Sequence, residues 1–135
     1  MKKNKGFTLV ELVIVIVIVG ILAMISVPIY RGHVQRAIAA EGHALAAEIA
    51  AAQEIYRTRT QTWYTPTNDE MASGVVPELG IDARRNSYFR SFTFTPDGEK
   101  FSVSLDGMAG TKAGSITIGL DWTPENPPTT SMCVK

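Results

Sequence analysis

Apolar residues fill the chain almost without interruption from Phe7 to Pro28, broken by four residues: Thr8, Glu11, Gly20 and Ser26. A helix rises about 1.5 Å per residue, so the segment from Phe7 to Val27 would span about 31 Å. That length is close to the ~30 Å hydrocarbon thickness of a bilayer. The pattern therefore predicts a helix that can cross a membrane.

Beyond Pro28 the apolar positions become periodic instead of continuous. As far as about Thr58 they recur at steps of three, four or seven residues and so share one helical face: Val34, Ile38, Leu45, Ile49, Ala52 and Tyr56. Charged residues are expected on the other faces: Arg36, Glu41, Glu48 and Arg57. The alanines between them favour helix. The two patterns together predict one helix of roughly fifty residues, whose second half offers an apolar stripe to a sheet.

The remaining residues predict a connecting segment and then β-strands. Proline, glycine and polar residues from 60 to 87 indicate a loop with one or two short helical turns, one of them capped by Asn68. Trp63 and Tyr64 are expected to pack at the helix end. Strands are expected at Tyr88–Phe94, Phe101–Leu105 and Ile116–Leu120, with a turn at Thr95–Gly98, a loop at Asp121–Pro128 and a short edge strand at Thr129–Val134. The fold class is α+β.

Two local features make the N-terminal segment more specific than a generic anchor. Gly6, at the junction between the basic leader MKKNKG and the apolar run, gives a protease close access to the backbone. Glu11 places a carboxylate inside a membrane segment, which costs roughly 2.5–3.5 kcal/mol and usually marks a partner or a function. If the chain is cut after Gly6, the new amine of Phe7 can pair with Glu11 of an adjacent copy. The anchor would then also be an assembly device.

The motif K-G-F-T-L-V-E-L, followed by a Val/Ile run, Gly20 and Pro28, resembles the class III signal segment of type IV pilins and pseudopilins. This resemblance implies that prepilin peptidase cuts after Gly6 and N-methylates Phe7. It implies that Glu11 serves subunit registration and that Gly20 and Pro28 are helix-weakening positions of the anchor. It further implies a head in which the helix packs on an antiparallel sheet of about four strands.

On this basis the chain divides into five segments: leader 1–6, filament-core half of the helix 7–28, amphipathic half 29–59, connecting loop 60–87, and sheet with C-terminal loop 88–135.

Charge and cysteine content restrict the function further. The chain has 13 basic and 13 acidic residues, and removing the three lysines of the leader leaves 10 against 13, a net charge of −3 before the new amine is counted. Such a surface has no net attraction for nucleic acid, and Arg84, Arg85, Arg90 and Lys100 are interpreted as scattered surface charge. Cys133 is the only cysteine. It excludes an intrachain disulfide and leaves open a harmless thiol, an intermolecular bridge or an attachment site.

No catalytic or cofactor motif is present in the sequence, so an enzyme, a cofactor and a metal are not expected. His33 and His43 lie ten residues apart, a spacing that does not bring two ligands together on a helix, and both are expected at the solvated surface. Asp106, Asp121 and Glu125 could contribute to a calcium site near the C-terminal loops, but their acidic spacing is loose. The aromatic residues Phe7, Tyr30 and Tyr56 are explained by packing rather than by electron conduction.

The sequence therefore predicts a structural subunit that is stored in the bacterial inner membrane, processed after Gly6 and polymerised into a helical surface filament for adhesion, motility or DNA uptake. Its expected partners are further copies of itself, prepilin peptidase, and an assembly platform with its motor. Three alternatives stay open: a pseudopilin of type II secretion, a minor pilin, and a globular protein held by an uncut signal anchor. Cleavage of the leader separates the last from the others.

Overall fold

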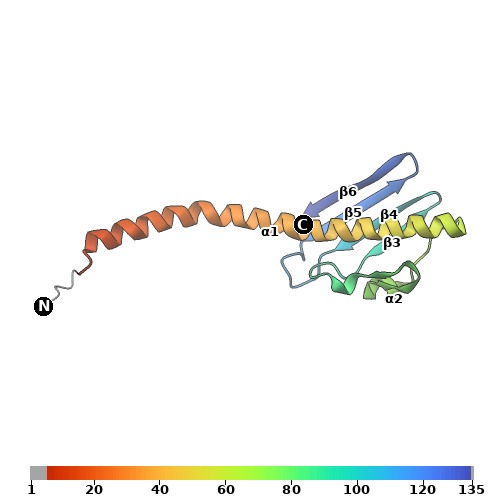
Figure 1. The fold of residues 1–135 in the computed structure, drawn as a ribbon, viewed down its shortest axis with the longest axis horizontal. Helices are drawn as coiled ribbons and strands as arrows, with labels where there is room; N and C mark the ends of the chain where they lie inside the picture. Colours follow the sequence, from red (N-terminus) through yellow and green to blue (C-terminus); the bar gives the residue numbers. More distant parts are fainter. Residues whose placement is uncertain (1–5, 135) are drawn as a thin grey trace. The chain divides into compact units, whose positions relative to one another are not determined.

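One long helix opens the fold in the computed structural model, which describes residues 6–134. Helix α1 (Leu9–Thr60, 52 residues) runs without a break and includes Pro28 (Figure 1). The predicted single helix of about fifty residues is thus confirmed. The chain separates into two compact units, Met1–Val34 and Gln35–Lys135, and α1 contributes to both of them.

The second unit contains a four-stranded antiparallel sheet with the strand order β3-β4-β5-β6. Its strands are β3 (Thr93–Asp97), β4 (Lys100–Asp106), β5 (Ile116–Thr123) and β6 (Asn126–Val134). Within this sheet β4, β5 and β6 each pair with the strand that precedes them in the chain, so the sheet is a simple meander (Figure 1). The α+β fold with a sheet of about four strands is confirmed.

The second half of α1 and one face of the sheet form the core of this unit. From the predicted helical stripe, Ile38, Leu45 and Ile49 are buried, and the other three members are half-buried. The sheet contributes alternate side chains, as a strand with one buried face should: Phe101, Val103 and Leu105 from β4, and Ile116, Ile118 and Leu120 from β5. The predicted apolar contact between helix and sheet therefore makes the core.

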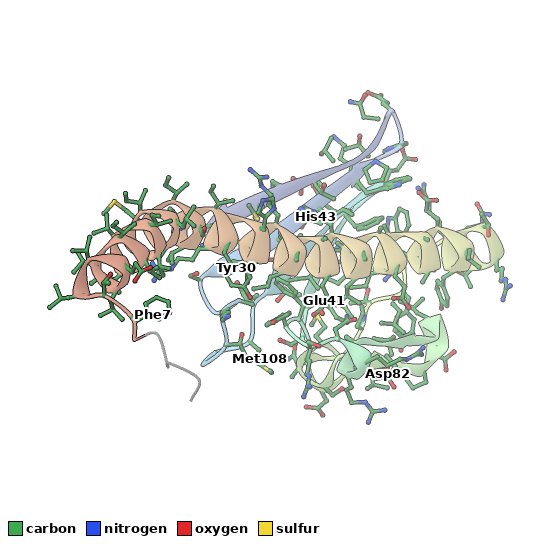
Figure 2. The ribbon with its side chains drawn as sticks, turned by 60° about the vertical axis from the view of Figure 1, so that its left-hand side comes forward. Phe7, Tyr30, Glu41, His43, Asp82 and Met108 are labelled. Carbon is green, nitrogen blue, oxygen red and sulfur yellow. The ribbon has the colours of Figure 1, made fainter. Side chains whose placement is uncertain are left out.

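The prediction that Glu41 faces away from the core was wrong. Its carboxylate oxygen accepts hydrogen bonds from the backbone N–H groups of Tyr88, at 2.6 Å, and Phe89, at 3.3 Å. Glu41 lies three residues after Ile38 and four before Leu45, so it borders the buried face of the helix. Figure 2 shows Glu41 and His43 leaving α1 on different sides.

These two hydrogen bonds also explain why the strand expected at Tyr88–Phe94 begins only at Thr93. Glu41 occupies the N–H groups of Tyr88 and Phe89, and the N–H of Phe92 donates to the carbonyl of Met71 at 3.1 Å. Phe89 and Phe92 are buried while their backbone is bonded outside the sheet. A periodicity of apolar residues alone does not reveal such tertiary backbone partners.

Both hairpins are tighter than the sequence suggested. The turn expected at Thr95–Gly98 shrinks to Gly98 and Glu99, with Gly98 at φ 60°, because β3 continues to Asp97. The loop expected at Asp121–Pro128 was also wrong, since β5 reaches Thr123 and β6 already begins at Asn126. Prolines are tolerated in these strands because β3 and β6 are the edges of the sheet.

The connecting segment contains more regular structure than was predicted. The expected short helical turns are present: α2 (Asn68–Ser73) and the 3-10 turns Pro77–Leu79 and Ala83–Arg85. A two-stranded pair of β1 (Val75–Val76) with β2 (Ile81–Asp82) was missed. Thr67, not Asn68, caps α2: its hydroxyl accepts from the N–H of Glu70, whose carboxylate accepts from the N–H of Thr67.

Gln53 ties the end of α1 to the segment that follows it. Its side chain is fully buried; the amide nitrogen donates to the carbonyl of Tyr64 at 2.8 Å, and its oxygen accepts from the N–H of Tyr64 at 3.0 Å. Both backbone groups of Tyr64 are thereby satisfied inside the core. The sequence analysis missed this contact because a glutamine within a helical pattern normally indicates a solvated position.

Replacing Gln53 by leucine should destabilise this unit by about 2–4 kcal/mol, since both backbone groups of Tyr64 lose their partners within the core. Leucine retains most of the volume, so the loss reports hydrogen bonding more than packing. Denaturant unfolding of the full chain in detergent, followed by tryptophan fluorescence, measures the effect. The control is Gln35→Leu at an exposed position of the same helix. Equal losses in the two variants would contradict the role of Gln53.

Candidate assembly site

The helix α1 begins with a reciprocal cap formed by Thr8 and Glu11. The hydroxyl of Thr8 accepts from the N–H of Glu11 at 3.2 Å, and the Glu11 carboxylate accepts from the N–H of Thr8 at 2.9 Å and from its hydroxyl at 2.7 Å. This is the S/T-x-x-E/Q capping box. Glu11 therefore has local donors within its own chain.

The cap reduces the unfavourable contribution of a carboxylate in an apolar segment, because the charge is hydrogen-bonded and lies at the positive end of the helix dipole. Thr8 is a residue whose role the sequence analysis missed. The spacing T-L-V-E in the sequence indicates this capping role. The same spacing, T-N-D-E, marks the cap of α2 at Thr67 and Glu70.

Apolar side chains surround the helix of the first unit on all sides. Every large apolar side chain from Leu9 to Tyr30 is at least 43% exposed. The helix is long and apolar enough to cross a membrane by length and composition. Such a surface needs either lipid or other apolar helices around it, because its burial is favourable in both environments.

The predicted processing site lies immediately before this helix. Phe7 is 81% exposed, and a Cβ placed at Gly6 would have no atom within 4 Å (Figure 2). The backbone at this junction is therefore sterically open in the structure. The leader residues Met1 to Lys5 lie outside the described residues.

Gly20 and Pro28 are not brought close to Glu11, as they lie further along the same helix. A side chain at Gly20 would meet no atom within 4 Å, so nothing in the isolated chain requires glycine there. Ser26, the other polar residue of the segment, donates from its hydroxyl to the carbonyl of Leu22 at 2.7 Å. This satisfies the hydroxyl within the helix itself.

Aromatic residues gather where α1 ends, as predicted for Trp63 and Tyr64. The Trp63 ring packs edge-on against Phe101 and Trp122, with centroid distances of 4.8 and 5.1 Å, and its indole N–H donates to the carbonyl of Gly98 at 3.0 Å. The guanidinium of Arg57 lies 4.5 Å from the Trp63 ring centroid. The cluster connects the end of α1 with the β3–β4 and β5–β6 hairpins.

Charged groups of the connecting segment pair locally. The N–H of Thr67, assisted by the hydroxyls of Thr67 and Tyr64, lowers the pKa of the Glu70 carboxyl below its ordinary value. Burial, with the nearby Glu70, raises the pKa of Tyr64. Hydrogen bonds from Arg84 to Asp82, the shortest at 2.9 Å, lower the pKa of Asp82. The Arg84 guanidinium is therefore already engaged by a carboxylate.

The lowered pKa of Glu70 predicts a pH dependence of α2. Its carboxylate contributes stability above the ordinary carboxyl pKa of about 4.5, and that contribution is lost as pH falls through the lower pKa of the folded state. Amide hydrogen exchange of residues 67–74, compared between pH 7 and pH 3 after correction for intrinsic rates, should therefore show less protection at the lower pH. Glu70→Gln should show a much smaller difference, whereas Glu99→Gln, in the exposed β3–β4 turn, should retain the full one.

The other candidate ligands do not form a site. Within residues 6–134, no three His, Cys, Asp or Glu side chains come together as a metal site would require, and Asp106 accepts a hydrogen bond from the hydroxyl of Thr117 at 2.7 Å. Cys133 is exposed on β6. His33 is exposed as predicted, but His43 is half-buried, and its buried Nδ1 has no partner in the described part of the chain. Its neighbours one turn away, Ala39 and Ala46, belong to the core.

Comparisons with known proteins agree with this arrangement. Residues 1–27 match the family model of the prokaryotic N-terminal methylation motif. The chain is 32% identical over 120 residues to the type IV major alpha-pilin of Moraxella bovis, covering 89% of this chain and 70% of that protein. It is 55% identical over 126 residues to the type IV major fimbrial protein FimA of Dichelobacter nodosus, covering 86% and 76% respectively. The chain belongs to the type IV pilins.

This type IV pilin is a structural subunit of a pilus, and the exposed apolar first half of its helix fits membrane anchoring before assembly. The relatives are structural proteins rather than enzymes. Type II secretion finds no support among the relatives named here. No solved structure is significantly similar to the chain.

Proposed function

We propose that this pilin is the major subunit of its filament. In this proposal it is stored in the inner membrane, cleaved by prepilin peptidase between Gly6 and Phe7, N-methylated at Phe7 and then polymerised by an assembly platform and its motor. The observation that carries the proposal is a membrane-length helix that is apolar on all sides and contains one capped carboxylate, Glu11. The relatives named as major pilins support the assignment to the abundant subunit.

Assembly exchanges lipid around the anchor for the anchors of neighbouring copies. Lipid tails and apolar side chains are about equally apolar, so this exchange has little hydrophobic driving force of its own. Energy must come from the motor, and specificity must come from a polar contact. The pairing of Glu11 with the amine of Phe7 of an adjacent copy supplies that contact, because a charge pair within an apolar bundle fixes the register of the helices.

The proposed roles of Gly20, Pro28 and the five chain segments follow from the same assembly proposal. Gly20 and Pro28 weaken the helix locally, since glycine has low helix propensity and proline lacks a backbone donor. The segments 1–6, 7–28 and 29–59 then act as leader, filament core and link to the head. Segments 60–87 and 88–135 form the exposed part of the filament, where surface partners would be met.

The intact mass of this subunit in filaments sheared from native cells tests the proposal. A dominant species that begins with N-methylated Phe7 supports processing and the role of major subunit. The processed species in trace amounts would indicate a minor pilin, and its confinement to the membrane fraction would indicate a pseudopilin. A full-length species beginning at Met1 would refute filament assembly and leave an anchored protein.

A further inference from the structure

The two edges of the four-stranded sheet differ in what covers them. At the β3 edge, the N–H of Phe94 donates to the sulfur of Met71 at 3.3 Å, and Met71 belongs to α2. The other edge is β6, which lies outermost beyond β5 (Figure 1). Its described side chains are all exposed, and its nine residues, NPPTTSMCV, include no charged residue. Charged side chains commonly protect an exposed edge strand, and β6 has none; its prolines, which also protect an edge, lie only at positions 127 and 128.

The register of the sheet identifies the backbone groups that face outward. The N–H of Gly107 donates to the carbonyl of Ile116 at 2.9 Å, so the even-numbered residues of β5 bond to β4. The odd-numbered ones then bond to β6, through the pairs Thr117↔Cys133, Gly119↔Ser131 and Asp121↔Thr129. The alternate residues of β6 therefore direct their N–H and carbonyl groups away from the sheet: Thr130, Met132 and Val134.

Pro96 and Pro128 agree with this register, whereas Pro127 lies at the register shift opposite Asp121 to Thr123. Pro128 falls on an outward position of β6, and Pro96 falls on an outward position of β3, so neither removes a bond of the ladder. In β3 the only other outward residue is Phe94, whose N–H is already used by Met71. The β3 edge therefore has no free donor, whereas the β6 edge has a row of three.

The outward residues of β6 also extend the apolar face of the sheet. Met132 and Val134 are paired with the buried residues Ile118 and Ile116, and directly paired residues lie on the same face. Nevertheless, Met132 is 44% exposed and Val134 is 51% exposed. The uncovered edge thus combines unpaired backbone groups with two apolar side chains.

We propose that β6 pairs antiparallel with β6 of a second copy of this chain in a neighbouring filament, with Met132 opposite Met132. The partner edge must supply donors as well as acceptors, and β3 has no free donor. Two uncharged β6 edges approach each other without repulsion. An antiparallel pair of identical strands is two-fold symmetric, whereas copies within one helical filament meet through heterologous contacts. The contact therefore joins separate filaments, where repeated pairs act together.

This register satisfies all three free N–H donors of the β6 edge. Met132 pairs with Met132, and Thr130 pairs with Val134 on both sides, so three pairs that each exchange two hydrogen bonds give about six bonds. Cys133 lies opposite Ser131 of the partner. Two Cys133 residues are then diagonal to each other, beyond the spacing at which a disulfide closes. Lateral association in this geometry does not use the thiol.

Electron microscopy and low-speed sedimentation of sheared filaments test the proposal, which rests on filament assembly. Native filaments should be bundled, and Met132→Lys should reduce the bundled fraction by about tenfold, because like charges face each other in the symmetric pair. Thr95→Lys, exposed on β3, is the matched control and should bundle normally. Mixing Met132→Lys filaments with Met132→Glu filaments should restore bundling.

Several outcomes would overturn the proposal while leaving the filament assignment intact. These are native filaments that remain single, equal losses in Met132→Lys and Thr95→Lys, and no rescue by the oppositely charged mixture. If Met132→Lys forms no filaments while Thr95→Lys does, β6 acts within a filament and the inter-filament assignment is wrong. Absence of native filaments would instead refute the proposed function.

Disulfide trapping gives an independent test of the register. In a Cys133→Ser background, Met132→Cys should give covalent dimers upon mild oxidation of bundled filaments, because opposed residues of a hydrogen-bonded pair have Cα atoms about 5.5 Å apart. The native Cys133 should give at least about tenfold less dimer under the same conditions. Equal trapping at both positions, or trapping through Cys133 alone, would overturn the register.

Discussion

Filament growth will stop when Glu11 is replaced by valine, although the chain will still enter the membrane. Valine removes a charge that costs roughly 2.5–3.5 kcal/mol within a bilayer, so insertion becomes more favourable. It also removes the carboxylate that would pair with the amine of Phe7 in the next subunit. Fractionation should therefore find the variant processed and abundant in the membrane, with no sheared filaments.

The capping box makes a second variant informative. Glu11→Gln retains an oxygen that can accept from the N–H of Thr8, but it carries no charge. If charge pairing guides registration, Glu11→Gln will fail as Glu11→Val does. Normal filaments from Glu11→Gln would mean that the cap alone is required, and normal filaments from Glu11→Val would reject the mechanism. Ile16→Val, which keeps the anchor apolar, is the control.

The first unit could be predicted from sequence because its determinants are local. An apolar run of membrane length, a proline that does not interrupt it and a T-x-x-E cap all lie within a few neighbouring residues. The predicted helix continued through Pro28 and ended at Thr60, close to the expected end. The partner of Glu11 within its own chain was overlooked, although the T-x-x-E spacing from Thr8 indicates it.

The second unit was predicted less well because its boundaries depend on distant residues. The strand expected from Tyr88 does not begin there, because the backbone N–H of Tyr88 donates to the carboxylate of Glu41, 47 positions away in the chain. The fully buried Gln53 and the half-buried His43 occupy positions whose polarity suggested solvent. Gln53 is buried because it bonds the backbone of Tyr64 in the connecting segment, and His43 is half-buried because it lies one turn from the core residues Ala39 and Ala46. The β5–β6 hairpin was missed because two prolines suggested a loop, whereas an edge strand tolerates them.

The same tight contact between helix and sheet predicts a large loss of stability for Gly42→Val. Gly42 is buried, and a Cβ at this position would lie 2.7 Å from Cγ1 of Ile118 and 3.0 Å from Cε2 of Phe89. Valine adds this Cβ and two methyl groups to that space, so α1 must move away from β5. We expect destabilisation of at least about 3 kcal/mol, at or beyond the upper end for overpacked cores. Thermal unfolding monitored by the fluorescence of Trp63 and Trp122 measures it.

Two further variants separate packing from backbone propensity. Ala47→Val introduces the same β-branched side chain at an exposed position of α1 and should cost less than about 1 kcal/mol. Gly42→Ala gains about 1 kcal/mol of helix propensity but places a methyl group against Ile118, so it should fall between wild type and Gly42→Val. Stabilisation by Gly42→Ala would mean that the sheet can yield at this contact. In that case Gly42 would not set the distance between α1 and β5. Gly42→Ala would then be more stable than wild type, contrary to the expected order of stability.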